Sequence, residues 1–266
     1  MQRNEVFLLF EYNSIYFKGN LILSDLHLGI EEEIGLRFGI ATEEMIKKLE
    51  KCKTFLKIKR KTWEQIIILG DLKNSIKTID KEVFSFFDSL VQIFSNEIKI
   101  KVVKGNHDGG IERLHKYFQS KLQIEIHPSS GFSQKISNQN CFFFHGNAYP
   151  QVEFLFSQKI FMGHLHPALR HSNKAKKCFA VCNPTLINEE FVFKKYKRNL
   201  MSLNKNIIKE NINLLEQKIY ILPSFNPFID GKISFYEDSL FLNNVYKYIA
   251  INLYSSEFVD FVILKK

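Results

Sequence analysis

The sequence lacks the features that mark membrane-spanning, secreted or disordered chains. No apolar run approaches the roughly 18 residues that cross a bilayer, and the N-terminal residues show no apolar region or cleavage site of a signal peptide. The four cysteines have neither a disulfide framework nor paired zinc-site spacing. A hydrophobic content of 45%, with 26 Phe, excludes disorder as the main state. We therefore expect a soluble, cytoplasmic protein with reduced thiols and no membrane partner.

Acidic residues are also fewer than basic ones. The chain has 37 Lys or Arg against 28 Asp or Glu, which leaves a net charge of +9. A basic surface attracts polyanions, including nucleic acid and phosphorylated metabolites. A solvated lysine face explains the same excess equally well, so the charge balance leaves both interpretations open.

Short apolar runs alternate with amphipathic stretches over the first two-thirds of the chain, as in an α/β layered domain. Helical spacing of apolar residues predicts a helix over residues 42–56, with Thr42 as its N-cap, and a second helix after Asp80. Buried strands are expected at residues 21–23, 66–69, 98–103, 141–144 and 159–162.

The pattern weakens after residue 186. A helix near residues 207–215 and a strand at residues 220–222 are the elements that it still indicates there. With no repeat and no linker in view, we expect a single domain over residues 1–266. Its motif core would span about 20–185, followed by peripheral additions over about 186–266. No pattern indicates an oligomeric state.

Side chains of the metal-binding type follow each of the five strands, where open α/β sheets place their sites. They are Asp25 and His27, Asp71, Asn106 and His107, His145, and His164 with His166. Carboxylate, imidazole and amide donors suit Mn²⁺, Fe or Zn²⁺ better than Ca²⁺ or Mg²⁺. Without His107 the set still has seven members, which is too many for one transition metal with an open position. It suits two ions that share a carboxylate.

Each cluster alone has a plain structural explanation. An Asp-x-His after a strand is more often a turn or a cap, Gly70-Asp71 is a common turn dipeptide, and Asp108 is a plausible cap of the following helix. Packing, however, gives little reason to end apolar strands with imidazoles. The ordered occurrence of such clusters at five successive strand ends therefore favours a shared site.

The series of motifs resembles the calcineurin-like metallophosphoesterase superfamily. The motifs that carry the resemblance are Asp25-Leu26-His27, Gly70-Asp71, Gly105-Asn106-His107-Asp108, His145-Gly146 and Gly163-His164-Leu165-His166. The longer forms Asp25-Leu26-His27-Leu28-Gly29 and Gly70-Asp71-Leu72-Lys73, with the late Leu222-Pro223-Ser224-Phe225-Asn226-Pro227, are similar to the SbcD-related phosphoesterases of archaea and bacteria. The main match runs from residue 24 to about 167.

The resemblance implies a fold, a metal site and a reaction. The fold is a four-layer α/β/β/α sandwich. One ion would be held by Asp25, His27, Asp71 and His166, and the second by Asp71, Asn106, His145 and His164, with Asp71 bridging. Mn²⁺ is the first choice of metal, with Fe and Zn²⁺ as alternatives. A metal-activated hydroxide would attack a phosphate ester, and His107 would protonate the leaving oxygen or stabilise the transition state; the plainer alternative for His107 is a residue that supports a ligand.

One position departs from the pattern. Related nucleases carry a second histidine three residues after the bridging aspartate, where this chain has Asn74. An amide can hydrogen-bond substrate or orient His107, but it cannot deliver a proton. We therefore expect a phosphodiesterase, with nucleotides or nucleic acid as candidate substrates. The alternatives are a phosphomonoesterase or cyclic-nucleotide phosphodiesterase, and a non-catalytic metal-binding scaffold.

Overall fold

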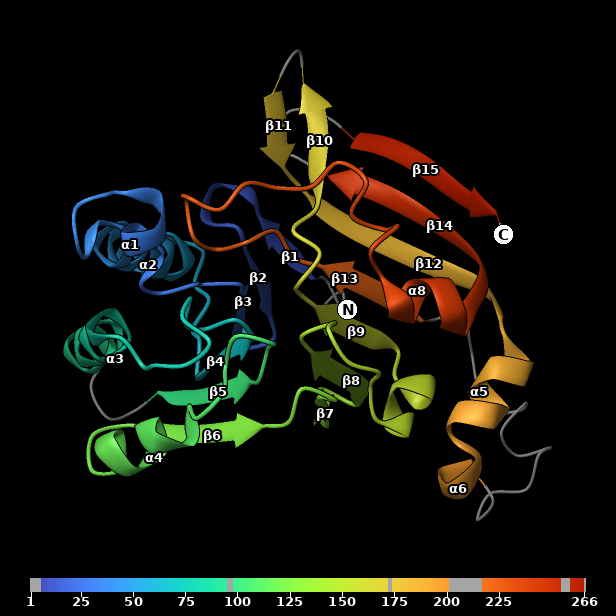
Figure 1. Cartoon of the computed structure of the whole chain (residues 1–266), viewed down its shortest axis with the longest axis horizontal. Helices are drawn as coiled ribbons and strands as arrows, with labels where there is room; N and C mark the ends of the chain where they lie inside the picture. The colour runs from blue at the N-terminus through green and yellow to red at the C-terminus, as the bar shows by residue number, and fades with distance from the viewer. Residues whose placement is uncertain (1–5, 95–97, 172–173, 201–216, 255–258, 266) are drawn as a thin grey trace.

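A computed structural model of the chain describes residues 6–94, 98–171, 174–200, 217–254 and 259–265. Two β-sheets pack face to face in it, with helices on their outer sides (Figure 1). The predicted helix near residues 207–215 lies outside the described residues.

The first sheet is built from the N-terminal half of the chain. Among the described residues it has six strands in sequential order, β1 (Phe7–Leu9), β2 (Ser14–Phe17), β3 (Asn20–Ser24), β4 (Gln65–Leu69), β5 (Lys99–Val103) and β6 (Gln123–His127). The strands from β3 to β6 are parallel. Their apolar runs are buried because helices cover one face and the second sheet covers the other. The strands predicted at residues 21–23, 66–69 and 98–103 are confirmed as β3, β4 and β5.

Helices cover the outer face of the first sheet. They are α1 (Ile30–Ile34), α2 (Ile40–Ile58), α3 (Lys81–Phe94) and α4 (Glu112–Phe118), and a short 3₁₀ helix, η1 (Phe10–Tyr12), packs beside α2. The helix predicted after Asp80 is confirmed as α3. The prediction that Thr42 caps α2 is wrong, because the helix begins at Ile40 and Thr42 lies buried in its first turn. The earlier start lets the fully buried Ala41 pack in the core.

The second sheet is built from strands between Phe132 and Lys265. Among the described residues its order is β15 (Val259–Lys265), β14 (Tyr246–Tyr254), β12 (Phe179–Ile187), β13 (Lys218–Ile221), β9 (Lys159–Met162), β8 (Gln139–Phe144) and β7 (Phe132–Ile136). The predicted strands at residues 141–144 and 159–162 are confirmed as β8 and β9. The strand predicted at residues 220–222 is β13, which pairs with β9 inside the sheet rather than at its periphery. The strands β13, β14 and β15, which follow residue 186, are therefore part of this layer.

Short helices and a separate hairpin accompany the second sheet. The helices are α5 (Glu189–Lys195), α6 (Lys197–Leu200) and α8 (Leu240–Val245), with a 3₁₀ helix, η3 (Val152–Phe156). The hairpin of β10 (Ala168–His171) and β11 (Lys174–Lys177) projects from the body (Figure 1). Among the described helices, none combines the length and the apolar character needed to traverse a bilayer.

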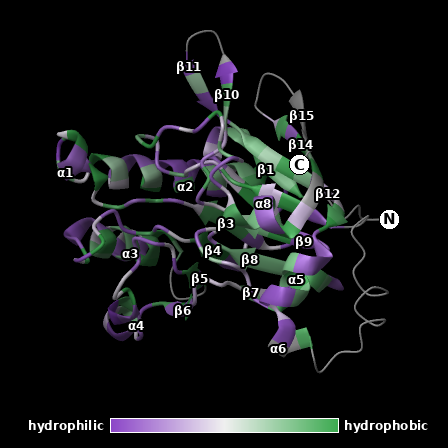
Figure 2. Ribbon diagram, turned by 45° about the vertical axis from the view of Figure 1, so that its right-hand side comes forward, coloured by the Kyte–Doolittle hydropathy of each residue, from purple (hydrophilic) through white to green (hydrophobic). Residues whose placement is uncertain are grey.

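An aromatic layer holds the two sheets together. Phe161 of β9 stacks on Phe143 of β8 and on Tyr220 of β13, with ring centroids 5.2 Å apart in both pairs. These rings share one apolar cluster with Ile22 and Ile67 of the first sheet. Figure 2 shows hydrophobic colouring along the strands of both sheets. With separate clusters under the outer helices, the arrangement confirms the predicted α/β/β/α sandwich.

Candidate metal centre

The loops that follow β3 and β4 continue the parallel pairing of these strands. His27 N donates to Asp71 O at 2.8 Å, Leu28 N to Leu72 O at 3.0 Å, and Asn74 N back to Leu28 O at 2.9 Å. Backbone hydrogen bonds thus fix the two loops against each other directly beyond the strand ends. The side chains of His27, Asp71 and Asn74 are thereby held in one place before they make any contact of their own.

Asp108 locks a third loop to this pair. Its buried carboxylate accepts hydrogen bonds from Leu72 N at 2.9 Å, Lys73 N at 3.2 Å and Gly105 N at 2.8 Å. Burial raises the pKa of the Asp108 carboxyl, and its amide partners oppose that shift. The interpretation of Asp108 as a helix cap is wrong, because α4 begins after Ile111 and has no side-chain cap. A carboxylate that joins two loops and one that caps a helix look the same in sequence.

Two glycines of the motifs are required by close packing. A Cβ at Gly105 would lie 2.2 Å from Asp71 Oδ1. A Cβ at Gly70, where φ is +74°, would lie 2.3 Å from the imidazole of His145. Any larger residue would displace a predicted site residue, so these glycines set the depth at which Asp71 and His145 sit.

The second sheet brings histidines to the same place. His145 Nδ1 lies 2.8 Å from Leu69 O; since a carbonyl only accepts, Nδ1 carries the proton and Nε2 faces Asp71 Oδ2 at 3.3 Å. From the loop after β9, His164 N donates to both carboxylate oxygens of Asp25, at 3.2 and 3.0 Å. Hydrogen bonds across the sandwich therefore join the two sets of loops.

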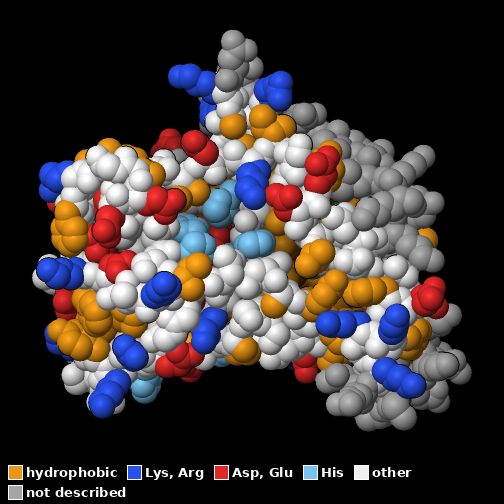
Figure 3. All heavy atoms as spheres, in the orientation of Figure 1, with side chains coloured by type: hydrophobic (Ala, Val, Ile, Leu, Met, Phe, Trp, Pro, Cys, Tyr) orange, Lys and Arg blue, Asp and Glu red, His pale blue; other side chains and the backbone are white. Residues whose placement is uncertain are grey.

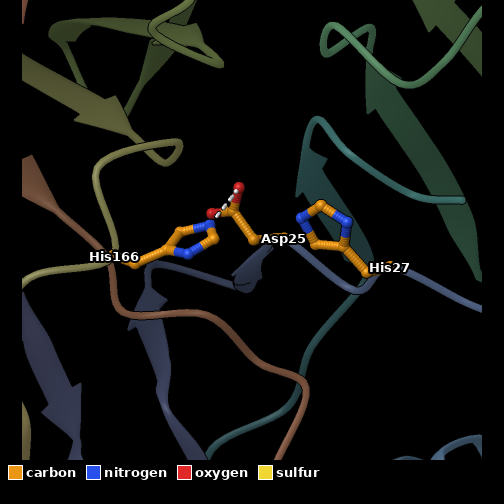
Figure 4. A group of neighbouring side chains, drawn as sticks. All are labelled: Asp25, His27 and His166. Atoms are coloured by element: carbon orange, nitrogen blue, oxygen red, sulfur yellow. Dashed lines mark ion pairs between the residues drawn. The ribbon is translucent and has the colours of Figure 1, made fainter. Parts of the chain in front are cut away.

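Three groups of ligand atoms form, each with all its atoms within 4.8 Å of one another. The groups are Asp25 with His27 and His166, Asp71 with His145 and His164, and His27 with Asp71 and His107. Figure 4 shows Asp25 between His27 and His166, whose Nε2 lies 3.0 Å from Asp25 Oδ1. Figure 3 shows histidine side chains gathered in a hollow near the middle of the face of the molecule that is drawn there.

The donor set fits divalent metal ions. His27 Nε2 is buried without a hydrogen-bond partner and lies 3.6 Å from Asp71 Oδ2. An imidazole nitrogen in that position is costly unless it finds a partner, and a cation held with the adjacent carboxylates would provide one. Carboxylate and imidazole donors together are the chemistry that Mn²⁺, Fe and Zn²⁺ accept.

The electrostatics of the centre depend on pairs of opposite charge. Burial alone would raise the pKa of the Asp25 carboxyl, but His166, His145 and His27 outweigh it and hold that pKa well below its ordinary value. Burial lowers the pKa of His145, yet Asp71 and Asp25 reverse this and raise it to about 9. The pKa values of the two carboxylates are lowered, so both are ionised at neutral pH.

His164 and His27 are held neutral at neutral pH. Burial and then His145 lower the pKa of His164 to about 4. Burial also lowers the pKa of His27. Neutral imidazole is the form that binds a metal.

His107, Asn74 and Asn106 complete the predicted set. His107 N donates to Asp71 Oδ1 at 3.0 Å, and its Nδ1 lies 2.6 Å from Asn74 O. The expectation that the Asn74 amide orients His107 is corrected, because the backbone carbonyl does so, while the side-chain Oδ1 lies 3.3 Å from His27 Nδ1. Asn106 is exposed on the loop between Gly105 and His107, both of which lie against Asp71.

Two supporting residues were given no role in the sequence analysis. Ser224 Oγ donates to Asp25 O at 2.8 Å, and Asn226 Nδ2 donates to Leu26 O at 2.7 Å. Both are fully buried and follow β13. They brace the Asp25 loop from a segment about 200 residues away in sequence. Polar residues between Pro223 and Pro227 were the available signal, and that signal is equally typical of an exposed turn.

A protein of known structure shares the fold of this chain. A structural search matches a nuclease, MPE, from Pseudomonas putida, with a TM-score of 0.55, 17% sequence identity, and coverage of 98% of this chain and 96% of that chain. An archaeal phosphodiesterase aligns with a TM-score of 0.38, 12% identity, and coverage of 91% of this chain and 98% of that one. Comparison with curated proteins found no match.

The family assignment comes from the sequence itself. The model of the calcineurin-like phosphoesterases matches residues 21–200, a range that contains every residue of the three ligand groups. This match covers well over half of the chain. The chain therefore belongs to the calcineurin-like phosphoesterases, metal-dependent hydrolases that act on phosphate esters.

Proposed function

We propose that this chain is a dinuclear metal-dependent phosphodiesterase. The observation that carries the proposal is the position of Asp71. One of its oxygens, Oδ2, lies 3.6 Å from His27 Nε2 and 3.3 Å from His145 Nε2, nitrogens that belong to different ligand groups. A carboxylate between two groups is what a pair of ions that share one ligand requires.

Each ion has its own proposed ligands. Asp25, His27, Asp71 and His166 would hold one, and Asp71, Asn106, His145 and His164 the other. Support comes from the ligand groups Asp25–His27–His166 and Asp71–His145–His164. Mn²⁺ is the proposed metal, and Fe and Zn²⁺ are the alternatives that the same donors accept. The chemistry that such a pair of ions supplies is an acidified water and neutralisation of charge on the phosphoryl oxygens.

His107 is the proposed catalytic residue. Its Nδ1 lies 2.6 Å from Asn74 O, so Nδ1 keeps a proton and Nε2 is the nitrogen available to exchange one. His107 is half-buried and its ring meets that of His27 edge-on at 4.9 Å. From this place it would donate a proton from Nε2 to the leaving oxygen of the ester. Asn74 has no proton to give, so this task falls to His107.

The proposed substrate is a phosphodiester, with nucleotides or nucleic acid as the leading candidates. A net charge of +9 is compatible with a polyanionic substrate, and the Pseudomonas putida protein of the same fold is described as a nuclease. The presence of a full set of ligand residues argues against a non-catalytic scaffold. The proposal includes a single domain over residues 1–266 and a cytoplasmic location.

A metal-dependent activity panel tests the proposal. The chain is stripped with a chelator, reloaded with Mn²⁺, and assayed on aryl phosphate mono- and diesters, cyclic nucleotides, single-stranded DNA and duplex DNA. We expect metal-dependent hydrolysis of the aryl diester. The rates on single-stranded and duplex DNA are then compared with the rate on this diester. Preference for the monoester would indicate a phosphomonoesterase, and cleavage of cyclic nucleotides alone would narrow the substrate. Absence of hydrolysis on every ester would overturn the proposal and favour a scaffold.

A further inference from the structure

We propose that Asn74 is a positioning residue that sets the tautomer of His27, and that Glu33 of α1 sets the orientation of Asn74. The inference rests on the metal centre proposed above. It concerns a residue that is asparagine here where related nucleases carry histidine, and it gives that departure a physical role at the metal side of the site.

The first step is the placement of Asn74. Its backbone N donates to Leu28 O at 2.9 Å, one link in the hydrogen bonds that join the loops after β3 and β4. Leu28 and Lys73 also form a parallel bridge. The backbone of Asn74 is therefore fixed by its neighbours, and its side chain starts from a defined point beside His27.

The second step is the orientation of the amide. Oxygen and nitrogen of an asparagine amide are distinguished by their partners. Asn74 Nδ2 lies 2.9 Å from Glu33 Oε2, and an ionised carboxylate can only accept. The NH₂ group must therefore face Glu33, which leaves Oδ1 facing His27 Nδ1 at 3.3 Å.

The third step is the tautomer of His27. Because Asn74 Oδ1 is an acceptor, His27 Nδ1 must carry the proton. The lone pair is then on Nε2, the buried nitrogen that has no hydrogen-bond partner and that lies 3.6 Å from Asp71 Oδ2. Glu33, Asn74 and His27 thus form a chain of hydrogen bonds that presents the correct nitrogen for metal binding before a metal arrives.

The two parts of Asn74 act separately. The side chain contacts His27, whereas the backbone carbonyl contacts His107. Truncation of the side chain removes the first contact and keeps the second. A loss of metal affinity in a variant that keeps the contact between Asn74 O and His107 Nδ1 is therefore the expected signature, and a general loosening of the loop would disturb both contacts.

The tautomer is measured directly on the metal-free protein. Long-range ¹H–¹⁵N NMR correlations of the histidine rings distinguish Nδ1–H from Nε2–H. In the natural chain we expect Nδ1–H at His27, and in Asn74→Ala a mixture of the two forms. Glu33→Gln replaces a carboxylate, which only accepts hydrogen bonds, with an amide that can also donate. The Asn74 amide is then less strictly oriented, so we expect a partial shift of His27 toward the Nε2–H tautomer. Glu32→Gln, one residue earlier on α1 and exposed, makes the same charge change and should leave the spectrum unaltered.

Titration calorimetry with Zn²⁺ or Mn²⁺ gives the second readout. Asn74→Ala should weaken binding of one ion by about 10–100-fold, the usual loss when a partner of a ligating histidine is removed. Glu33→Gln should weaken it less, and Glu32→Gln should not. Thermal unfolding checks that each variant is folded.

The outcomes separate this inference from the proposed function. An Nε2–H tautomer at His27 in the natural chain, or natural metal affinity in a folded Asn74→Ala, overturns the role of Asn74. Absence of metal binding by the natural chain would instead overturn the metal centre, and the tautomer would still decide the role of Asn74 because it is read without metal.

Discussion

The two sheets contribute to the centre in different ways. The first sheet supplies both carboxylates, Asp25 and Asp71, on loops joined by backbone hydrogen bonds. The second supplies imidazoles, those of His145, His164 and His166. Both carboxylates thus come from the first sheet, whereas histidines come from both, since His27 and His107 also follow strands of the first sheet. The groups Asp25–His27–His166 and Asp71–His145–His164 each need residues of both sheets, so the pair of groups exists only when the sandwich is assembled.

The difference extends to how each half is held. The loops of the first sheet contact one another, and the Asp108 carboxylate joins its own loop to the loop after β4. Ser224 and Asn226 add two hydrogen bonds to the Asp25 loop from the segment after β13. The histidines of the second sheet depend on the first sheet, because His145 Nδ1 donates to Leu69 O and His164 N donates to Asp25. We therefore expect changes in the first sheet to affect both proposed ions, and changes in the contact between the sheets to affect stability.

Asp71→Asn should have the largest effect. The variant keeps the shape of the side chain but loses a charge between two ligand groups, so both proposed ions bind weakly and hydrolysis falls by about 10⁴-fold or more. Elemental analysis of metal per chain, with turnover of an aryl diester, measures both. Asp88→Asn on α3, half-exposed and paired with Lys121, is the matched control. Retention of two ions per chain in Asp71→Asn would argue against a bridging position.

His107→Ala should separate catalysis from metal binding. If His107 donates the proton, turnover falls by roughly 10²–10⁴-fold while the metal content stays the same. His115→Ala, on the exposed side of α4, should turn over substrate normally. Near-natural rates in His107→Ala would remove its assigned role, and loss of metal would make it a ligand, as its group with His27 and Asp71 allows.

The contact between the sheets is tested by Phe161→Ala. Phe161 is fully buried and stacks on Phe143 and Tyr220, so its loss should lower the free energy of unfolding by about 3–5 kcal/mol. Phe38→Ala, with 63% of that residue exposed, should change it by less than about 0.5 kcal/mol. Denaturant unfolding compares them. Equal stability of the two variants would contradict the dependence of the centre on packing between the sheets.

The pH dependence of metal affinity is the smallest of the predicted effects. His145, which faces Asp71, Asp25 and His164, has a pKa raised to about 9 without metal, so at pH 7 a binding ion must displace its proton. Affinity should therefore rise about tenfold per pH unit up to pH 9 and then level off. His164, whose pKa is lowered to about 4, releases no proton in this range. Calorimetry from pH 6.5 to 9 measures the slope, and a flat profile would contradict the pairing of His145 with Asp71.

The raised pKa of His145 also makes the stability of the metal-free chain depend on pH. Stability should fall as the pH rises, whereas metal affinity should increase. A folded-state pKa of about 9 against about 6.5 in the unfolded chain means that His145 stabilises the metal-free protein fully below pH 6.5. This contribution is lost as the pH rises toward 9. Denaturant unfolding of the metal-free chain over this range should show it.

The strands and their polar ends were predictable because both have local causes. Apolar runs such as residues 66–69 read directly as buried strands, and parallel strands bring their carboxyl ends to one edge. The position of β13 was not predictable, since it pairs with β9 across a long stretch of chain. The start of α2 was missed because the core contact of Ala41 outweighs the capping preference of Thr42.

The candidate site was predictable in its residues but not in their support. The histidines and aspartates stand out because core packing gives little reason for such polar residues at the ends of apolar strands. Asp108, Ser224 and Asn226 act through hydrogen bonds to backbone atoms of distant loops, and no local pattern distinguishes them from turn residues. The role of Asn74 depends on Glu33, which lies 41 residues earlier.

Anomalous diffraction from crystals grown with Mn²⁺ tests the central claim most directly. We expect two anomalous peaks in one pocket, with Asp71 in contact with both, one peak beside Asp25 and His166 and the other beside His145 and His164. A single peak, or peaks away from these side chains, would contradict a centre assembled by both sheets.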